Sequence, residues 1–149
     1  MNELNKAYQA ALYYLSRREY SAYELRQRLL QKEFAERVIN EALLKLEQDN
    51  YLNPARFVES LIYNKMQRGY GPLRIQQELR QHQIDSELLL QSERWQNADW
   101  FELAREVRQR RFGLTAIHDL KQKAKQARFL YARGFSQDQI KYALSETID

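Results

Sequence analysis

The chain has 149 residues, 44% of them hydrophobic and 30% charged, with a formal net charge of +4 and no cysteine. This length suits one or two compact units and excludes a large multidomain enzyme, and the lack of cysteine excludes a disulfide scaffold and a thiolate metal site. The longest apolar run near the N-terminus, residues 10–15, is too short to cross a membrane and follows no basic segment. We therefore expect a cytoplasmic chain that is neither secreted nor inserted into a membrane.

Helices are expected along the whole chain, because only four glycines and two prolines interrupt it. Apolar residues recur at spacings of three and four, which is the period of a helix with one buried face. Within residues 1–52, three such stripes predict three helices. The stripes comprise Leu4, Tyr8, Ala11, Leu12 and Leu15, then Ala22, Leu25 and Leu29, then Val38, Ile39, Ala42, Leu43 and Leu46.

The same three-helix pattern returns within residues 53–98 and again within residues 99–149, so that nine helices are expected in all. The stripes of the first of these segments comprise Phe57, Leu61, Ile62 and Met66, then Ile75 and Leu79, then Leu88 and Leu89. Those of the second comprise Phe101, Ala104 and Val107, then Leu120, Ala124, Ala127 and Tyr131, then Ile140 and Leu144.

An internal repeat explains this recurrence. A shift of fifty residues places RREYSAYELRQRL, residues 17–29, on QRGYGPLRIQQEL, residues 67–79. The sequence LLQKEF at the end of the second helix likewise returns as LRQHQI and as LYARGF. We predict an all-α protein in which three tandem three-helix repeats form an elongated, curved, solenoid-like slab. The predicted repeats span residues 1–52, 53–98 and 99–149.

Helix-start and helix-stop signals fall between the stripes. Residues 21–24 and 136–139 have the Ser-x-x-Glu or Ser-x-x-Gln spacing of a capping box, in which two side chains satisfy two free backbone N–H groups. Pro54 and Pro72 are expected at first helical positions, where the missing N–H costs nothing. The expected helix stops are Gly113 and Gly134.

Charge is distributed unevenly among the predicted helices. Residues 17–32 carry five basic and two acidic side chains, residues 65–80 carry four and one, and residues 104–133 carry nine and two. The third helices are acidic instead, with two basic and five acidic side chains in residues 33–49 and one and five in residues 84–102. If homologous helices face the same side, the slab has one basic flank and one acidic flank.

A basic flank favours an acidic partner, such as the phosphates of a nucleic acid. Two structural alternatives stay open. Arginines at helix C-termini, such as Arg110 and Arg111, are stabilised by the helix dipole whatever the function. Lys121, Lys125 and Arg128, which are spaced along one helix face, fit a merely solvated face as well.

No catalytic, cofactor-binding or metal-binding constellation stands out, and we expect no enzyme and no cofactor. His82 and His118 are the only histidines, and neither forms an i, i+4 pair with a second ligand. The segment GYGP, residues 69–72, is too short for a phosphate loop and opens no Walker pattern.

Aromatic side chains offer another route to nucleic-acid binding, because ten tyrosines and two tryptophans could stack on bases. Tyr20, Tyr70 and Tyr131 nevertheless fall on or near the apolar stripes, so packing is the favoured interpretation. Trp95 and Trp100 are expected to pack at the junction of the second and third repeats.

Three stretches that cover nearly the whole chain carry a family resemblance. They are ALYYLSRREYSAYELRQRLLQKEF, PARFVESLIYNKMQRGYGPLRIQQELRQHQI and QKAKQARFLYARGFSQDQIKYAL. The chain resembles the RecX family, the regulators of the bacterial recombinase RecA, and the middle stretch matches the central pattern of that family residue by residue at Arg68-Gly69-Tyr70-Gly71-Pro72. Asn53 replaces a usual acidic residue and His82-Gln83 replaces a usual Lys-Gly; both changes concern caps and turns.

The resemblance implies a non-enzymatic regulator that binds the RecA nucleoprotein filament in its groove and inhibits ATP hydrolysis, strand exchange and SOS co-protease activity. DNA contact would be weak or auxiliary, and the chain is expected to be a monomer. Two alternatives stay open: a helical repeat protein that binds single- or double-stranded nucleic acid directly, and a general helical adaptor. The residues predicted to contact RecA or DNA are Arg18, Arg26, Arg28, Arg68, Arg74, Arg108, Arg111, Lys121, Lys125, Arg128 and Arg133.

Overall fold

The computed structural model describes residues 2–145, and every regular element in this range is an α-helix. The all-α prediction is confirmed. None of these helices is both long enough and apolar enough to cross a lipid bilayer. In chain order the helices are α1 (Glu3–Leu15), α2 (Ala22–Gln31), α3 (Glu36–Gln48), α4 (Pro54–Gln67), α5 (Pro72–Gln81), α6 (Ser86–Leu90), α7 (Glu93–Asn97), α8 (Trp100–Phe112), α9 (Leu120–Ala132) and α10 (Gln137–Ser145).

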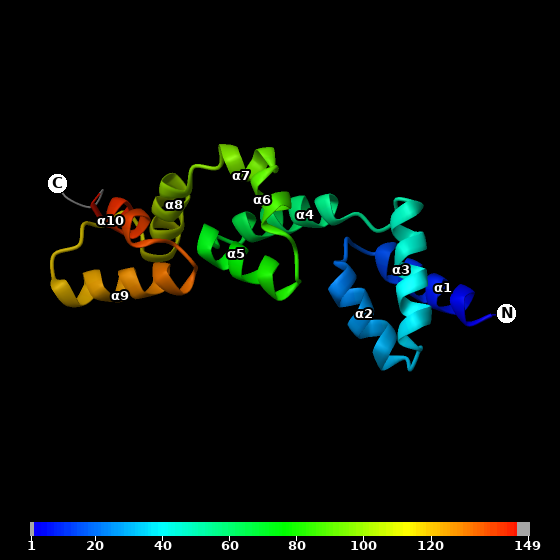
Figure 1. Ribbon diagram of the computed structural model, residues 1–149. Helices are drawn as coiled ribbons and strands as arrows, with labels where there is room; N and C mark the ends of the chain where they lie inside the picture. The colour runs from blue at the N-terminus through cyan, green and yellow to red at the C-terminus, as the bar shows by residue number, and fades with distance from the viewer. Residues whose placement is uncertain (1, 146–149) are drawn as a thin grey trace. The chain divides into compact units, whose positions relative to one another are not determined.

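The helices belong to two compact units. The first unit comprises Met1–Ser60 and Leu79–Ser92, and the second comprises Leu61–Glu78 and Glu93–Asp149. Helices α1, α2 and α3 therefore lie wholly in the first unit, and α8, α9 and α10 lie wholly in the second, as the labels of Figure 1 allow the reader to follow. The helices of the middle repeat are divided between the two units.

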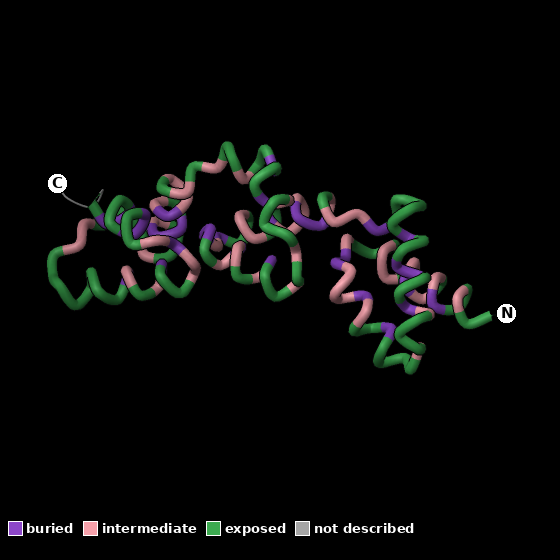
Figure 2. Tube along the Cα trace, in the orientation of Figure 1, coloured by how far each residue is buried: buried purple, intermediate pink, exposed green. Residues whose placement is uncertain are grey.

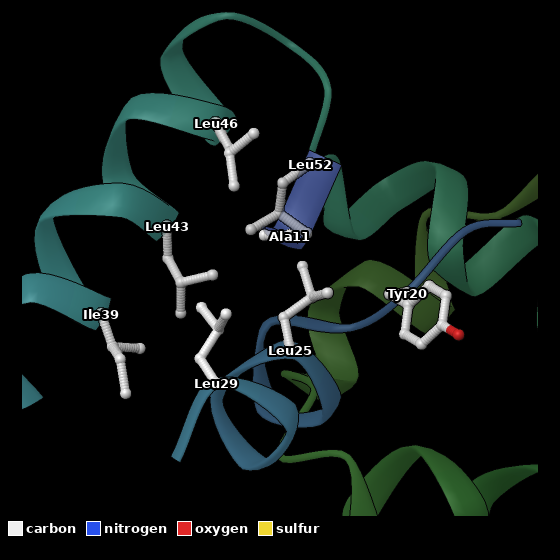
Figure 3. Close-up of a cluster of buried hydrophobic side chains, with 8 residues drawn as sticks. All are labelled: Ala11, Tyr20, Leu25, Leu29, Ile39, Leu43, Leu46 and Leu52. Carbon is white, nitrogen blue, oxygen red and sulfur yellow. The ribbon is translucent and has the colours of Figure 1, made fainter. Parts of the chain in front are cut away.

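The core of the first unit is formed by α1, α2 and α3, each of which contacts the other two. Figure 3 shows Leu25 and Leu29 of α2 pointing toward Leu43 and Leu46 of α3, as the apolar stripes predicted. Leu25, Leu29 and Leu46 have no exposed surface at all. Burial of one leucine contributes about 1.5–3 kcal/mol relative to exposure, so this cluster supplies much of the stability of the unit.

The core of the second unit is formed by α8, α9 and α10, which also contact one another pairwise. Leu130 and Phe135 are completely buried there, together with Ala104 and Ala143. One predicted stripe is wrong. Leu120, Ala124 and Tyr131 were expected to face the core, but all of them are exposed, and α9 buries Gln126 and Leu130 instead.

The third helix of the middle repeat is broken, so the described residues contain ten helices where the stripes predicted nine. The break between α6 and α7 falls at residues 91–92. In the first repeat the apolar stripe of the third helix continues through Ala42, Leu43 and Leu46, but the residues fifty positions later are Ser92, Glu93 and Gln96. Because these positions carry polar side chains, a continuous helix would bury little apolar surface there, even though Ser92 itself is buried.

The second helix of every repeat ends in the same hydrogen-bonded turn. Glu33 N–H donates to the Leu30 carbonyl and Phe34 N–H donates to the Leu29 carbonyl, at 2.9 and 3.2 Å. These are the two bonds of a Schellman motif, in which one residue adopts a left-handed conformation. That residue is Glu33 with φ 67°, Gln83 with φ 58° and Gly134 with φ 95°. The three sequences LLQKEF, LRQHQI and LYARGF are thus confirmed as versions of one helix end.

The predicted helix caps are also confirmed. In residues 21–24 the Ser21 hydroxyl accepts from the backbone N–H of Glu24 and the Glu24 carboxylate accepts from the backbone N–H of Ser21. Residues 136–139 form the same pair of bonds. Pro54 and Pro72 occupy first helical positions, and Gly113 caps the end of α8. These signals are local, which is why the sequence alone reveals them.

Glycine at the left-handed positions of the first two repeats is expected to stabilise the protein. A residue with a side chain pays about 1–2 kcal/mol to adopt the left-handed conformation, and glycine avoids this cost. Glycine loses more backbone entropy on folding, which offsets about 0.5–1 kcal/mol of that gain. Glu33→Gly and Gln83→Gly should therefore each raise the free energy of unfolding by about 0.5–1 kcal/mol, as measured by urea denaturation. Lys32→Gly is the control, because Lys32 has φ −86° and gains nothing from glycine. Equal losses in all three variants would contradict the assignment.

Candidate polyanion-binding site

A cavity of about 210 Å³ in the second unit collects arginines from the chain segments that end α4, α8 and α9. Arg68, Arg110 and Arg111 are exposed at its rim and Arg133 is half-buried. Among the residues that the structure describes, no carboxylate lines this cavity. The described residues that line it are Arg68, Gly69, Val107, Arg110, Arg111, Phe129 and Arg133.

Arg133 is held in place from two sides. Its Nη1 donates a hydrogen bond of 2.7 Å to the carbonyl oxygen of Arg68. Its guanidinium carbon lies 5.0 Å from the ring centroid of Tyr70 and 5.0 Å from that of Phe129, which is cation–π distance for both rings. Because a guanidinium carries five N–H donors, this arrangement fixes the side chain and leaves donors for an anion.

Tyr70 contacts two further cations. Lys65 Nζ lies 5.1 Å and the Arg74 guanidinium carbon 4.7 Å from the centre of its ring. Both cations also pair with Glu78, at 3.0 Å from Lys65 Nζ and 3.7 Å from Arg74 Nε. Lys65 and Arg74 are therefore partly neutralised and stabilise the unit around Tyr70. This agrees with the packing role expected of Tyr70.

The cavity depends on a close backbone contact that the sequence did not reveal. Gly71 N–H donates to the Arg133 carbonyl at 2.7 Å, and Leu73 N–H donates to the Gly134 carbonyl at 3.0 Å. A Cβ atom on Gly71 would lie 2.5 Å from the Gly134 carbonyl oxygen, and one on Gly134 would lie 2.4 Å from the Cβ of Arg74. Only two glycines allow these turns to meet. The sequence signal was present in GYGP and ARGF, but nothing in it pairs the two segments.

Three of the arginines predicted to contact a partner, Arg68, Arg111 and Arg133, meet at this cavity. Arg110, which was not among the predicted contact residues, joins them. Lys121, Lys125 and Arg128 are exposed on α9 of the same unit, as the predicted basic face requires.

Arg108 is the exception, and its place on the exposed basic face was predicted wrongly. Its exposed fraction is 1%. Its Nε donates to the Gln126 side-chain oxygen at 2.8 Å and its Nη2 donates to the Thr115 carbonyl at 3.2 Å. Burial lowers the pKa of Arg108. The hydrogen bonds compensate part of the desolvation cost, so Arg108 serves the core of the second unit and not its surface.

The predicted basic residues of the first unit are engaged within that unit. The Arg18 guanidinium lies 3.6 Å from the centre of the Tyr20 ring, and its Nη2 pairs with the Glu24 carboxylate at 2.8 Å. The Arg28 guanidinium lies 5.3 Å from the Tyr14 ring centre. Arg26 donates a hydrogen bond to the side chain of Asn40, which joins α2 to α3.

The protein is therefore a helical repeat protein, in which the second and third repeats together form an arginine-lined cavity. Comparison with family models identifies its family. The family models for the first, second and third three-helix domains of RecX match residues 7–46, 54–91 and 97–144. The chain belongs to the RecX family.

Relatives named regulatory protein RecX support this membership. The protein of Vibrio parahaemolyticus serotype O3:K6 is 39% identical over 137 residues, which are 92% of this chain and 88% of the relative. That of Legionella pneumophila (strain Corby) is 36% identical over 143 residues, covering 96% of this chain and 95% of the relative.

Solved structures support the fold. The crystal structure of RecX from Lactobacillus salivarius has a TM-score of 0.74 and 24% sequence identity, and the comparison covers 97% of this chain and 96% of that one. A second crystal structure, of regulatory protein RecX, has a TM-score of 0.76 and 22% identity, and covers 96% of this chain and 73% of that one.

The double-glycine contact can be tested by substitution. Gly71→Ser would supply the hydroxyl that caps the equivalent helices, and capping alone would make it neutral or favourable. The clash with Gly134 should instead lower the free energy of unfolding by about 1–3 kcal/mol, as measured by thermal unfolding followed by circular dichroism. The matched control is Ser136→Gly at the N-cap of α10, which should cost only a few tenths of a kcal/mol. Equal effects of the two substitutions would refute the close contact.

The pair formed by Arg18 and Glu24 makes a prediction about pH. Burial raises the pKa of Glu24, but hydrogen bonds from Arg18 and from the Ser21 backbone N–H outweigh it and hold this pKa below its ordinary value of 4.5. A carboxyl whose folded pKa is depressed stabilises the protein above its unfolded pKa, and this contribution disappears as the pH falls through the folded pKa. Unfolding measured from pH 6 to pH 3 should show a loss that Glu24→Gln makes shallower. Glu47→Gln, at an exposed site on α3, is the matched control, and an equal change of slope in both variants would contradict the prediction.

Proposed function

We propose that the chain binds the RecA nucleoprotein filament in its groove and inhibits ATP hydrolysis, strand exchange and SOS co-protease activity. Membership of the RecX family and the name regulatory protein carried by its relatives support regulation of RecA. In this proposal the chain acts by binding and not by catalysis, as a monomer in the cytoplasm, and DNA repair by homologous recombination is the process it affects.

The arginine cavity is the observation that carries the proposed mode of contact. Arg68, Arg110, Arg111 and Arg133 surround one hollow that no carboxylate lines. Guanidinium groups bind phosphate oxygens through paired N–H donors, and their attraction to a polyanion acts over roughly the 8–10 Å Debye length of physiological salt. The cavity would bind the DNA phosphates of the filament. Lys121, Lys125 and Arg128 would extend this contact along α9.

A second candidate function is direct binding of single- or double-stranded nucleic acid, and the same cavity favours it. The two proposals predict different effects of free DNA on the inhibition of RecA. If the protein acts by capturing DNA, its effect on RecA should vanish when free DNA is in excess. If it recognises the filament, inhibition of a preformed filament should persist at protein concentrations well below that of RecA.

Reversing two charges at the cavity rim tests the proposed contact. Arg110→Glu/Arg111→Glu should weaken binding to RecA-coated single strands by at least about tenfold and reduce the salt dependence of binding by about two phosphate contacts. Fluorescence anisotropy of labelled DNA, bare and RecA-coated, measures the affinities, and RecA ATPase assays measure inhibition.

The matched control is Arg37→Glu/Lys45→Glu, which changes the charge by the same amount on α3 in the first unit, where both side chains are exposed. It should change affinity less than about twofold, because neither side chain lines the arginine cavity. If both double variants lose affinity equally, net charge and not the cavity is responsible. If the wild-type chain leaves the ATPase of preformed filaments unchanged, the proposed regulation is wrong.

A further inference from the structure

One side of α9 is apolar and faces solvent. Leu120 is 83% and Tyr131 66% exposed, and Figure 2 draws most of α9 in the colour of exposed residues. Two cavities of about 620 and 530 Å³ lie between this side of α9 and α10. Both are lined by Ala127 and Ile140, so they form one continuous groove, which we call the α9–α10 groove.

The first repeat shows how an equivalent groove is closed. The alignment of LLQKEF with LYARGF places Arg26 of α2 at the position of Ala127, and Asn40 of α3 at the position of Lys141. In the first repeat these two side chains are joined by a hydrogen bond that bridges the two helices. Alanine at position 127 cannot reach across, so the third repeat leaves the groove open.

An additional helical turn lengthens the groove. Under the same alignment Ala22, the first residue of α2, corresponds to Lys123, whereas α9 begins at Leu120. The additional turn contributes Leu120 to the groove lining. The apolar stripe of α9 then runs through Leu120, Ala124, Ala127 and Tyr131, and α10 contributes Ile140, Leu144 and the aliphatic stem of Lys141.

The charged side chains that line the groove are basic. They are Lys123, Arg128 and Lys141, and within residues 2–145 no acidic side chain is among the lining residues. Helix α9 itself carries four basic residues and no acidic one. An apolar ligand flanked by carboxylates would be attracted here, and one flanked by cations would be repelled.

The groove and the arginine cavity use different sides of α9. Phe129 and Arg133 line the cavity, whereas Ala127 and Tyr131 line the groove. A difference of two positions turns about 200° around a helix with 3.6 residues per turn. A ligand in the groove therefore leaves the arginine cavity accessible, and of the residues proposed to contact the filament it would cover Arg128.

We propose that the α9–α10 groove binds an amphipathic helix of a partner protein, with apolar residues spaced i, i+4 and i+7 toward the groove and Asp or Glu along both flanks. Two parallel apolar stripes are the surface that receives such a helix, and its anchors supply the affinity. The basic rim selects acidic flanks. This interaction goes beyond the proposed contact of the arginine cavity with a polyanion and does not depend on it.

The test uses the full chain and a fluorescein-labelled synthetic helix of about eighteen residues, with leucines at i, i+4, i+7 and i+11 and glutamates on the flanks. A second peptide with the same leucines and lysine flanks measures the selectivity. The glutamate peptide should bind at least about tenfold more tightly than the lysine peptide in anisotropy titrations. Ala127→Arg/Lys141→Asn, which installs the bridging pair of the first repeat, should weaken the glutamate peptide by at least about tenfold.

Three further variants separate peptide binding from effects on folding, on the first repeat and on the arginine cavity. Tyr131→Gln, at an exposed site, should weaken the glutamate peptide while leaving the melting temperature unchanged. Leu30→Gln, at the equivalent position of the first repeat, should leave peptide binding unchanged. Arg110→Glu/Arg111→Glu should also leave it unchanged, which separates this proposal from the proposed regulation of RecA.

Several outcomes would overturn the proposal. Equal affinity for the two peptides would show that the charges do not select the partner. No binding of the glutamate peptide at about 1 mM, the weak end of specific association, would show that the groove does not bind such a helix. A further outcome concerns the oligomeric state, which sedimentation velocity measures. A dimer of the wild-type chain that Ala127→Arg/Lys141→Asn abolishes would show that a second copy of the chain occupies the groove.

Discussion

The second unit depends on a backbone contact that leaves no room for a side chain. Residues 69–73 and residues 133–134 are joined by two main-chain hydrogen bonds, and Cβ atoms on Gly71 or Gly134 would overlap the opposite segment. The two segments are far apart in the sequence, so the contact closes a long loop, whose entropy cost grows only slowly with length. Once it forms, the ends of α4 and α9 bring Arg68 and Arg133 to one cavity.

The basic residues of this chain serve three different purposes, which a count of charges cannot separate. Arg18 and Arg74 lie over tyrosine rings and pair with carboxylates, so much of their charge is used inside their own unit. Arg108 is buried and satisfied by an amide and a carbonyl oxygen. Arginines such as Arg110 and Arg111 are instead exposed beside a cavity whose described lining contains no carboxylate, so their field reaches an external anion.

The sequence predicts what is decided locally. The capping boxes at residues 21–24 and 136–139 and the helix end at Gly134 depend on neighbours within a few positions, and the repeat adds two further copies of the same evidence. The break after α6 was also visible in principle, since polar residues replace the stripe. The arginine cavity was predictable only as a set of residue types, because its assembly depends on the pairing of Gly71 with Gly134, which no local pattern encodes.

The orientation of α9 was mispredicted because of one buried polar pair. In the first repeat Leu25 faces the core, and the equivalent residue of the third repeat is Gln126. Gln126 is buried because its side-chain oxygen accepts from Arg108, and a buried guanidinium without such a partner would cost several kcal/mol. Satisfying Arg108 therefore fixes which side of α9 faces inward, and the stripe of Leu120, Ala124 and Tyr131 must face outward. The same pair that removes Arg108 from the basic surface thus creates the apolar surface beside it.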